Sequence, residues 1–251
     1  MRPRPIRRGS RRRATAETQR EPVSLARVNV LSLSSQLRHA ADPIWQAQHE
    51  HPFLQGIADG SLAAERFTFY IRQDYLFLVE YARLLAIGAA RSPDLATMTR
   101  FAQLTTEILT TEMDLHRSLC AELGISAAAL EAESSSPTTQ GYTDFLVRTA
   151  AQGDFAELAA ALLPCMWGYA ELGQALAARG RSPDDRYARW IDMYAAAEFA
   201  ELADWCRALV DRLGAGLPDC GRARAEQAFV TSSRYELAFW EMAWNGERWP
   251  V

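Results

Sequence analysis

Apolar residues recur at helical spacing along nearly the whole chain, and no stretch shows strand-like alternation bounded by turns. A core built from such segments has to form by packing helix faces against one another. We therefore predict an all-α fold, a single-domain helical bundle of about seven or eight helices. The length of 251 residues suits one domain with a sizeable core.

Capping and helix-breaking residues predict where these helices begin and end. Asp42-Pro43 has the pattern of a helix start, and Gly124 and Gly180 have the pattern of helix ends. Residues 131–141 read as a loop. The predicted helices cover residues 44–50, 62–91, 93–123, 142 onward, 154–180, 183 onward and 222–244.

Charge is distributed unevenly along the chain. Residues 1–20 hold eight arginines against the single acid Glu17, which leaves a net −11 on residues 21–251, since the total is −4. We predict a disordered arginine-rich arm over residues 1–22 and one helical domain over 23–251. Three interpretations of the arm stay open. It tethers the protein to nucleic acid or anionic lipid, it is a solvated extension, or the start of the chain has been assigned too far upstream. The acidic body argues against nucleic acid as a partner.

Several classes of chemistry are excluded or disfavoured by composition. All 27 basic residues are arginine, which excludes a Schiff-base lysine and the lysine of a phosphate loop. The four cysteines are widely spaced with no C-x-x-C pair, which favours a reducing cytoplasm over a disulfide framework. No apolar run reaches the roughly 18–20 residues that span a bilayer. We therefore expect a cytoplasmic protein with no membrane partner.

Metal and cofactor motifs are also missing from the pattern. Glu112 and His116 stand four residues apart and share a helix face, but the Glu-x-x-His pairs of di-iron bundles do not occur. No glycine-rich phosphate loop and no G-x-S-x-G segment occurs. We expect neither a metal nor a cofactor.

Two carboxylates interrupt apolar stripes that face the predicted core. Asp74 lies in the stripe Phe67, Tyr70, Asp74, Phe77, Tyr81, Leu85, and Glu236 lies in the stripe Phe229, Ser232, Glu236, Phe239, Ala243. Carboxylates are rarely buried without partners because desolvating a charge is costly. The two acids therefore line a polar pocket, or they cap backbone groups or pair with arginines such as Arg72 and Arg234.

A third stripe carries a cysteine: Leu158, Leu162, Cys165, Tyr169, Leu172, Leu176. Pro164 directly precedes Cys165 and releases the carbonyl group of Ala160 from the helix, which kinks the helix there. Such a kink aims a side chain into a cavity. The alternative is that Cys165 is a small buried hydrophobic residue.

Several segments together resemble the TenA (thiaminase II) family over about residues 35–248. In family order and spacing they are HPFLQGIADG (51–60), YIRQDY (70–75), EMDLH (112–116), SPT (136–138) with Tyr142 and Thr143, ALLPCMW (161–167) and SSRYELAFW (232–240). The last two segments, taken together, are specific for this family, whereas HPF alone would not identify it.

This resemblance implies a haem-oxygenase-like helical fold, a homotetramer, and cysteine-dependent hydrolysis of aminopyrimidines or thiamin in thiamin salvage. It implies Cys165 as the nucleophile and Glu236 as the general acid. The implied substrate-binding residues are Asp74, Phe77, Tyr142, Tyr169, Tyr194 and Phe239.

One position departs from the family pattern, since many members have tyrosine where this chain has Phe77. We expect lower turnover from the missing hydroxyl, with function retained. Two other functions stay open. One is a non-catalytic pyrimidine-binding or regulatory protein, and the other is a metal-using enzyme of the same fold.

Overall fold

The computed structural model describes residues 31–250, which contain twelve α-helices, one π-helical turn and no strand. The all-α prediction is confirmed. The helices are α1 Leu33–Ala40, α2 Asp42–His49, α3 Pro52–Asp59, α4 Ala64–Arg91, α5 Leu95–Glu107, η1 Ile108–Glu112, α6 Met113–Glu122, α7 Ala127–Glu131, α8 Pro137–Gln152, α9 Phe155–Ala177, α10 Asp185–Ala195, α11 Ala197–Gly214 and α12 Asp219–Asn245. The arm predicted over residues 1–22 and the first residues of the predicted domain lie outside the described residues.

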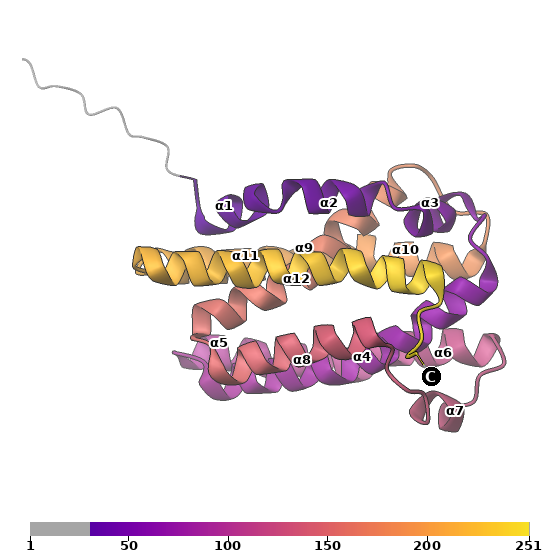
Figure 1. The fold of residues 1–251 in the computed structure, drawn as a ribbon, viewed down its shortest axis with the longest axis horizontal. Helices are drawn as coiled ribbons and strands as arrows, with labels where there is room; N and C mark the ends of the chain where they lie inside the picture. Colours follow the sequence, from indigo (N-terminus) through magenta and orange to yellow (C-terminus); the bar gives the residue numbers. More distant parts are fainter. Residues whose placement is uncertain (1–30, 251) are drawn as a thin grey trace, which may run out of the picture. The chain divides into compact units, whose positions relative to one another are not determined.

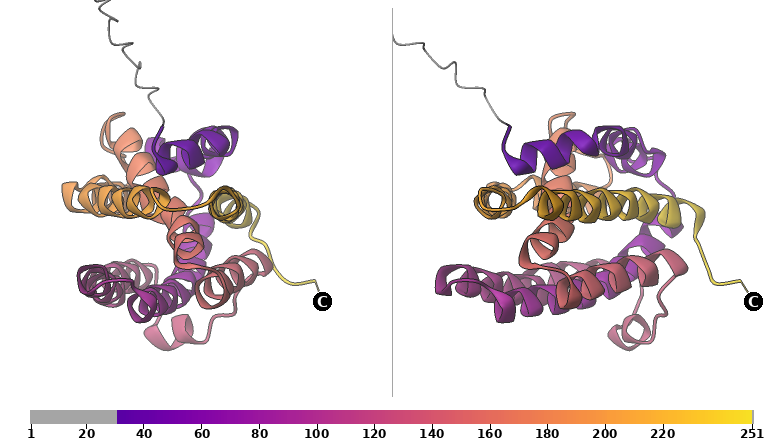
Figure 2. Two further views of the ribbon diagram at one scale, coloured as in Figure 1. Left: turned by 90° about the vertical axis from the view of Figure 1, so that its left-hand side faces the viewer. Right: turned by 60° about the vertical axis from the view of Figure 1, so that its left-hand side comes forward.

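The helices of residues 31–250 pack around α9 (Figures 1 and 2). This helix contacts α4, α8, α10, α11 and α12. In Figure 1, α4, α5 and α8 lie on one side of α9 and α12, and α1 to α3 lie on the other. One continuous apolar cluster fills the space between them. The helices that carry the three predicted stripes, α4, α9 and α12, thus meet in the interior.

Three helix boundaries differ clearly from the prediction. The segment predicted as one helix over 93–123 is interrupted by the π-helical turn η1. The helix predicted from residue 183 onward is divided between α10 and α11, because Ala196 takes an extended conformation (ψ 144°). The loop predicted over 131–141 is shorter, since α8 begins at Pro137 with Ser136 as its capping residue. The count of seven or eight helices is therefore too low.

Pro164 lies inside α9, where it cannot donate a backbone hydrogen bond. Two hydroxyl groups bind carbonyl groups just N-terminal to it: Ser232 donates to Ala161 (2.7 Å) and Tyr81 donates to Leu162 (3.0 Å). Hydroxyl groups from α12 and α4 thus bind the backbone of α9 within about one turn of Cys165. These two bonds help to position the cysteine relative to α4 and α12.

At Gly173, the backbone of α9 lies close to the backbone of α10. A Cβ atom at this position would lie 2.5 Å from the backbone carbon of Tyr194. We expect Gly173→Ala to destabilise the fold by about 1–3 kcal/mol, the usual cost of overpacking. Thermal unfolding measures this effect. The matched control is Gly168→Ala in the same helix, where the nearest atom is 3.9 Å away, so equal melting temperatures for the two variants would contradict the expectation.

Candidate active site

The predicted site residues converge from five helices. We call this group the central site: Asp74 and Phe77 from α4, Tyr142 from α8, Cys165 and Tyr169 from α9, Tyr194 from α10, and Glu236 and Phe239 from α12. The ring of Phe77 lies 5.0 Å from that of Tyr142 and 5.7 Å from that of Phe239. The ring of Tyr169 lies 4.8 Å from that of Tyr194. Aromatic rings therefore surround the polar groups of the central site.

Glu236 is buried and holds one short hydrogen bond. Tyr142 donates its hydroxyl to Glu236 Oε1 at 2.5 Å, and the same hydroxyl lies 2.9 Å from the hydroxyl of Ser232. Burial raises the pKa of Glu236 to about 8, and the negative charge of Asp74 adds to this, while the bond from Tyr142 opposes it. Glu236 is therefore mostly protonated at neutral pH and can donate a proton.

Asp74 is buried in a polar network. Tyr70 donates to Asp74 Oδ2 (2.9 Å), and His116 Nε2 lies 2.7 Å from the same oxygen. The other ring nitrogen of His116, Nδ1, lies 2.9 Å from the carbonyl oxygen of Glu112. Both nitrogens of His116 thus face acceptors, which favours the imidazolium form and a buried ion pair with Asp74.

The pKa of His116 follows from the same geometry. Burial lowers it, but the hydrogen bond and the charge of Asp74, together with Glu112, outweigh burial and leave the pKa above its ordinary value. The arginine pairing considered for Asp74 is wrong, because Arg72 instead donates to Glu133 Oε2 at 2.7 Å. The charge of Asp74 is balanced by His116.

Cys165 is the least enclosed member of its stripe and retains some accessible surface. Burial of the sulfur raises the pKa of Cys165 well above its ordinary value, and the charges of Glu236, Glu112 and Asp74 raise it further. The group is therefore a thiol, and a thiolate has to form in the course of the reaction.

Four polar residues of this region were not assigned to the site by the sequence: Tyr70, Tyr81, Glu112 and His116. Tyr70 and Tyr81 lie on the same α4 stripe as Asp74, which is the signal that could have included them. Glu112 and His116 were considered as metal ligands and as the ends of the EMDLH segment, but no role in the site was assigned to them. Their Glu-x-x-x-His spacing was a signal for a pair on one helix face, whereas the π-helical turn that ends at Glu112 has no mark in the sequence.

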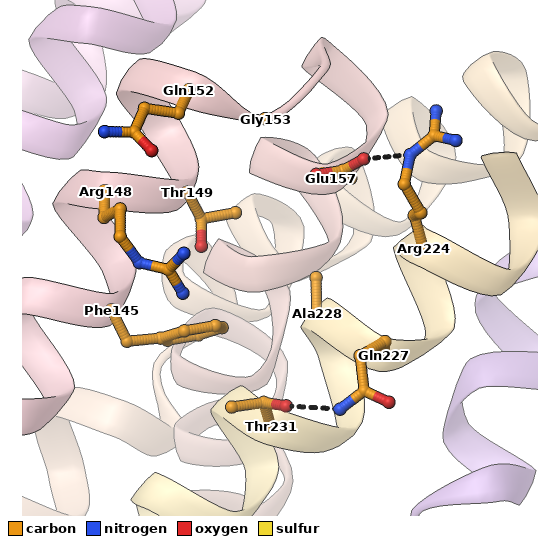
Figure 3. A pocket seen from close by; sticks show the side chains of 10 residues that line it. All are labelled: Phe145, Arg148, Thr149, Gln152, Gly153, Glu157, Arg224, Gln227, Ala228 and Thr231. Carbon is orange, nitrogen blue, oxygen red and sulfur yellow. Dashed lines mark hydrogen bonds and ion pairs between the residues drawn. The ribbon is translucent and has the colours of Figure 1, made fainter.

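Within residues 31–250 no group of three or more histidine, cysteine, aspartate or glutamate side chains is arranged to hold a metal ion. No helix in this part of the chain has the length and apolar character to cross a membrane. A separate surface pocket of about 410 Å³ lies between α8, α9 and α12 (Figure 3). Arg224 on its rim donates to Glu157, and the pocket contains no residue of the central site.

A helical bundle that encloses a cysteine and several carboxyl groups within aromatic rings has the makeup of a site for a flat, polar ring compound. The chain belongs to the TENA/THI-4/PQQC family, whose model matches residues 38–246. A relative from Halalkalibacterium halodurans, named aminopyrimidine aminohydrolase, is 44% identical over 220 residues, covering 87% of this chain and 98% of the relative.

Solved structures agree with this assignment. A TenA homologue from P. horikoshii has a TM-score of 0.80 at 31% identity, covering 86% of this chain and all of the homologue. A domain with a haem-oxygenase-like fold from Shewanella denitrificans has a TM-score of 0.69 at 12% identity, over 86% of this chain and 94% of that domain. The second likeness concerns the fold alone, and it confirms the haem-oxygenase-like prediction.

Proposed function

We propose that this chain is a hydrolase that replaces the 5-methylene substituent of an aminopyrimidine by hydroxyl, as an aminopyrimidine aminohydrolase of thiamin metabolism. The substrates are 4-amino-5-aminomethyl-2-methylpyrimidine and thiamin, and the shared product is the hydroxymethylpyrimidine. One observation carries the proposal: Cys165, Asp74 and Glu236 come from three separate helices and act electrostatically on one another inside an aromatic enclosure.

The proposed reaction begins with attack of the Cys165 sulfur on the ring carbon next to the one that bears the substituent. Glu236 gives its proton to a ring nitrogen as the sulfur–carbon bond forms, and the thiol proton returns to Glu236. The net transfer moves the thiol proton to the ring. The step creates no new buried charge on the protein. This agrees with the raised pKa values of Cys165 and Glu236, which keep both groups protonated before the reaction.

Loss of aromaticity then allows the substituent to leave. The electron pair of the ring nitrogen forms the exocyclic double bond as the bond to the departing nitrogen breaks, which releases ammonia or thiazole. Water adds to the methylene carbon, and the proton it loses is taken up by the released base. The sulfur–carbon bond then breaks with its electron pair returning to sulfur, and the ring nitrogen gives its proton back through Glu236, which restores the aromatic ring and the thiol. The aminomethyl cation and water thus become the hydroxymethyl compound and ammonium, and all atoms and charges balance.

The remaining residues of the central site position the ring. Asp74, held by Tyr70 and His116, accepts hydrogen bonds from the 4-amino group. Phe77, Tyr169 and Phe239 flank the pyrimidine. The hydroxyl of Tyr142 binds Glu236 Oε1 and orients the acid. Tyr194 contributes to the enclosure through its contact with Tyr169.

Incubation of the purified chain with the aminomethylpyrimidine and with thiamin, followed by chromatography of the hydroxymethylpyrimidine formed, tests the proposal. Turnover of either compound supports a hydrolase. Binding of both compounds without any product would instead support the binding or regulatory protein.

Phe77 stands where many family members have tyrosine. Its ring is stacked on that of Tyr81 (5.4 Å) and lies 5.0 Å from that of Tyr142, so a hydroxyl added to this ring would join the buried polar groups of the central site. We expect Phe77→Tyr to raise kcat by roughly two- to tenfold, the scale of one added hydrogen bond of about 0.5–1.5 kcal/mol. Steady-state kinetics measure this. No gain would count against a catalytic part for that hydroxyl in this chain.

We also propose a cytoplasmic location and a homotetramer, both of which rest on the sequence and on the family resemblance. Light scattering of the purified chain measures the assembly, and a monomer would contradict this expectation.

A further inference from the structure

A groove of about 360 Å³ opens between η1 and the junction of α10 with α11. Its walls are mainly apolar and include Ile108, Met193, Phe199 and Leu202. Two exposed acids, Glu107 and Glu198, also line it and add negative charge to the groove. Glu112 lines the same groove although only 7% of its surface is exposed. A nearly buried carboxyl group in the lining of a mainly apolar groove is unusual, because burial of a charge costs free energy unless a partner compensates it.

The two oxygens of Glu112 have different surroundings. Oε1 accepts a hydrogen bond from Tyr194 at 2.8 Å, whereas Oε2 has no hydrogen-bond partner within residues 31–250. Tyr194 belongs to the central site. Glu112 therefore connects the groove with the central site, and its charge acts on Cys165.

Its partners and its place in the groove distinguish Glu112 from the other two buried acids. His116 compensates Asp74 through a direct bond of 2.7 Å, and Glu236 carries a proton at neutral pH. His116 touches Glu112 only through its backbone carbonyl oxygen. Asp74 is therefore the one of the three acids with a bonded cation in this part of the chain, and of the other two only Glu112 lines the groove.

The ionisation of Glu112 is finely balanced. Burial raises its pKa to about 7, with a further rise from Asp74, while the positive charge of His116 and the bond from Tyr194 lower it. A cation that enters next to Oε2 would favour the ionised form and bind to it. The substituents that leave in the proposed reaction are cations in both substrates, an ammonium in one and a thiazolium in the other.

We propose that this groove receives the departing substituent of the substrate and that Glu112 in its lining selects for a positively charged one. This inference rests on the proposed function. The aromatic and aliphatic walls suit the thiazolium ring, which is larger than an ammonium group and mostly apolar at its edge. The π-helical turn places Glu112 there, and such turns often occur at functional sites.

The test compares two pyrimidines that differ in one charged group. The aminomethyl and hydroxymethyl compounds have the same shape, but only the first is a cation. In a Cys165→Ser background, which prevents turnover, calorimetry measures the Kd of each compound with and without Glu112→Gln. We expect the substitution to weaken binding of the aminomethyl compound roughly tenfold or more, the scale of a charge-assisted hydrogen bond. Binding of the hydroxymethyl compound should change less than twofold.

Glutamine keeps an acceptor for the hydroxyl of Tyr194, so the variant should fold. Glu226→Gln on the exposed surface of α12 is the control with the same change of charge, and it should leave both Kd values unchanged. Equal weakening of the two compounds by Glu112→Gln, or weakening of neither, would overturn the inference. Wild-type protein that neither binds nor hydrolyses any pyrimidine would instead overturn the proposed function.

A second variant tests the groove independently of Glu112. Thr111 lines the groove and is exposed, so Thr111→Trp fills the groove without disturbing the core. We expect the KM for thiamin to rise at least fivefold and the KM for the aminomethyl compound to change little, because the thiazolium needs the space. An unchanged KM for thiamin would overturn the role of the groove.

Discussion

Cys165→Ser is expected to lower kcat/KM for the aminomethylpyrimidine and for thiamin by about 10³-fold or more, the scale seen when a covalent nucleophile is removed. The serine hydroxyl has a far higher pKa than a thiol, and the site around position 165 is already unfavourable to a negative charge. Burial and the nearby acids hold the pKa of Cys165 well above its ordinary value. An alkoxide would be harder to form there than a thiolate.

Binding should survive this substitution, because the rings and acids of the central site are unchanged. Product formation in a single-turnover assay and Kd by calorimetry separate the two effects. Cys220→Ser makes the same replacement at an exposed cysteine on α12 and should retain full activity. Equal activity of Cys165→Ser and the wild type would eliminate Cys165 as the nucleophile.

Glu236→Gln is expected to reduce kcat by roughly 10²–10⁴-fold, the usual contribution of a general acid. Glutamine keeps an acceptor for the hydroxyl of Tyr142 but has no proton to deliver to the ring. In the wild type the pKa of Glu236 is about 8, so the acid form is lost as the pH rises through 8. We therefore expect kcat/KM to decline above about pH 8. A flat profile up to pH 10 would contradict the general-acid role.

The same substitution should stabilise the fold at alkaline pH. The pKa of Glu236 is about 8 in the folded chain and near 4.5 when unfolded, so its contribution to stability is complete below about 4.5. That contribution is lost as the pH rises from there through 8. Glutamine cannot ionise and avoids the loss.

At pH 9 we expect Glu236→Gln to have a free energy of unfolding about 1–2 kcal/mol higher than the wild type. In a domain of this size, that difference raises the melting temperature by roughly 2–8 °C. At pH 4.5 the two should melt within about 2 °C of each other. Calorimetry at both pH values checks this, and Glu226→Gln provides the exposed control. A wild type that melts higher at pH 9 would show that Glu236 is stabilised in its ionised form.

The helical fold and the inward-facing positions of Asp74, Cys165 and Glu236 could be predicted because helix periodicity is a local property. Tyr142 and Tyr194 lie on none of the predicted stripes, and only the family resemblance assigned them to the site. Phe67, Tyr70, Asp74, Phe77 and Tyr81 repeat every three or four residues, and all of them are buried on one face of α4. Glu236 shows the same relation to Phe229 and Phe239 on α12. An acid within an apolar stripe marks a polar interior position whatever the helix packs against.

The sequence by itself thus determined that the chain is helical and that Asp74, Cys165 and Glu236 face the interior. Only the tertiary structure decided which partners these groups meet. His116 pairs with Asp74 from 42 positions away, and Tyr194 reaches Glu112 across 82 positions. These pairings decide which acid carries a charge, and no periodicity encodes them, because they depend on how separate helices cross and on a π-helical turn that shifts one helix face relative to the next.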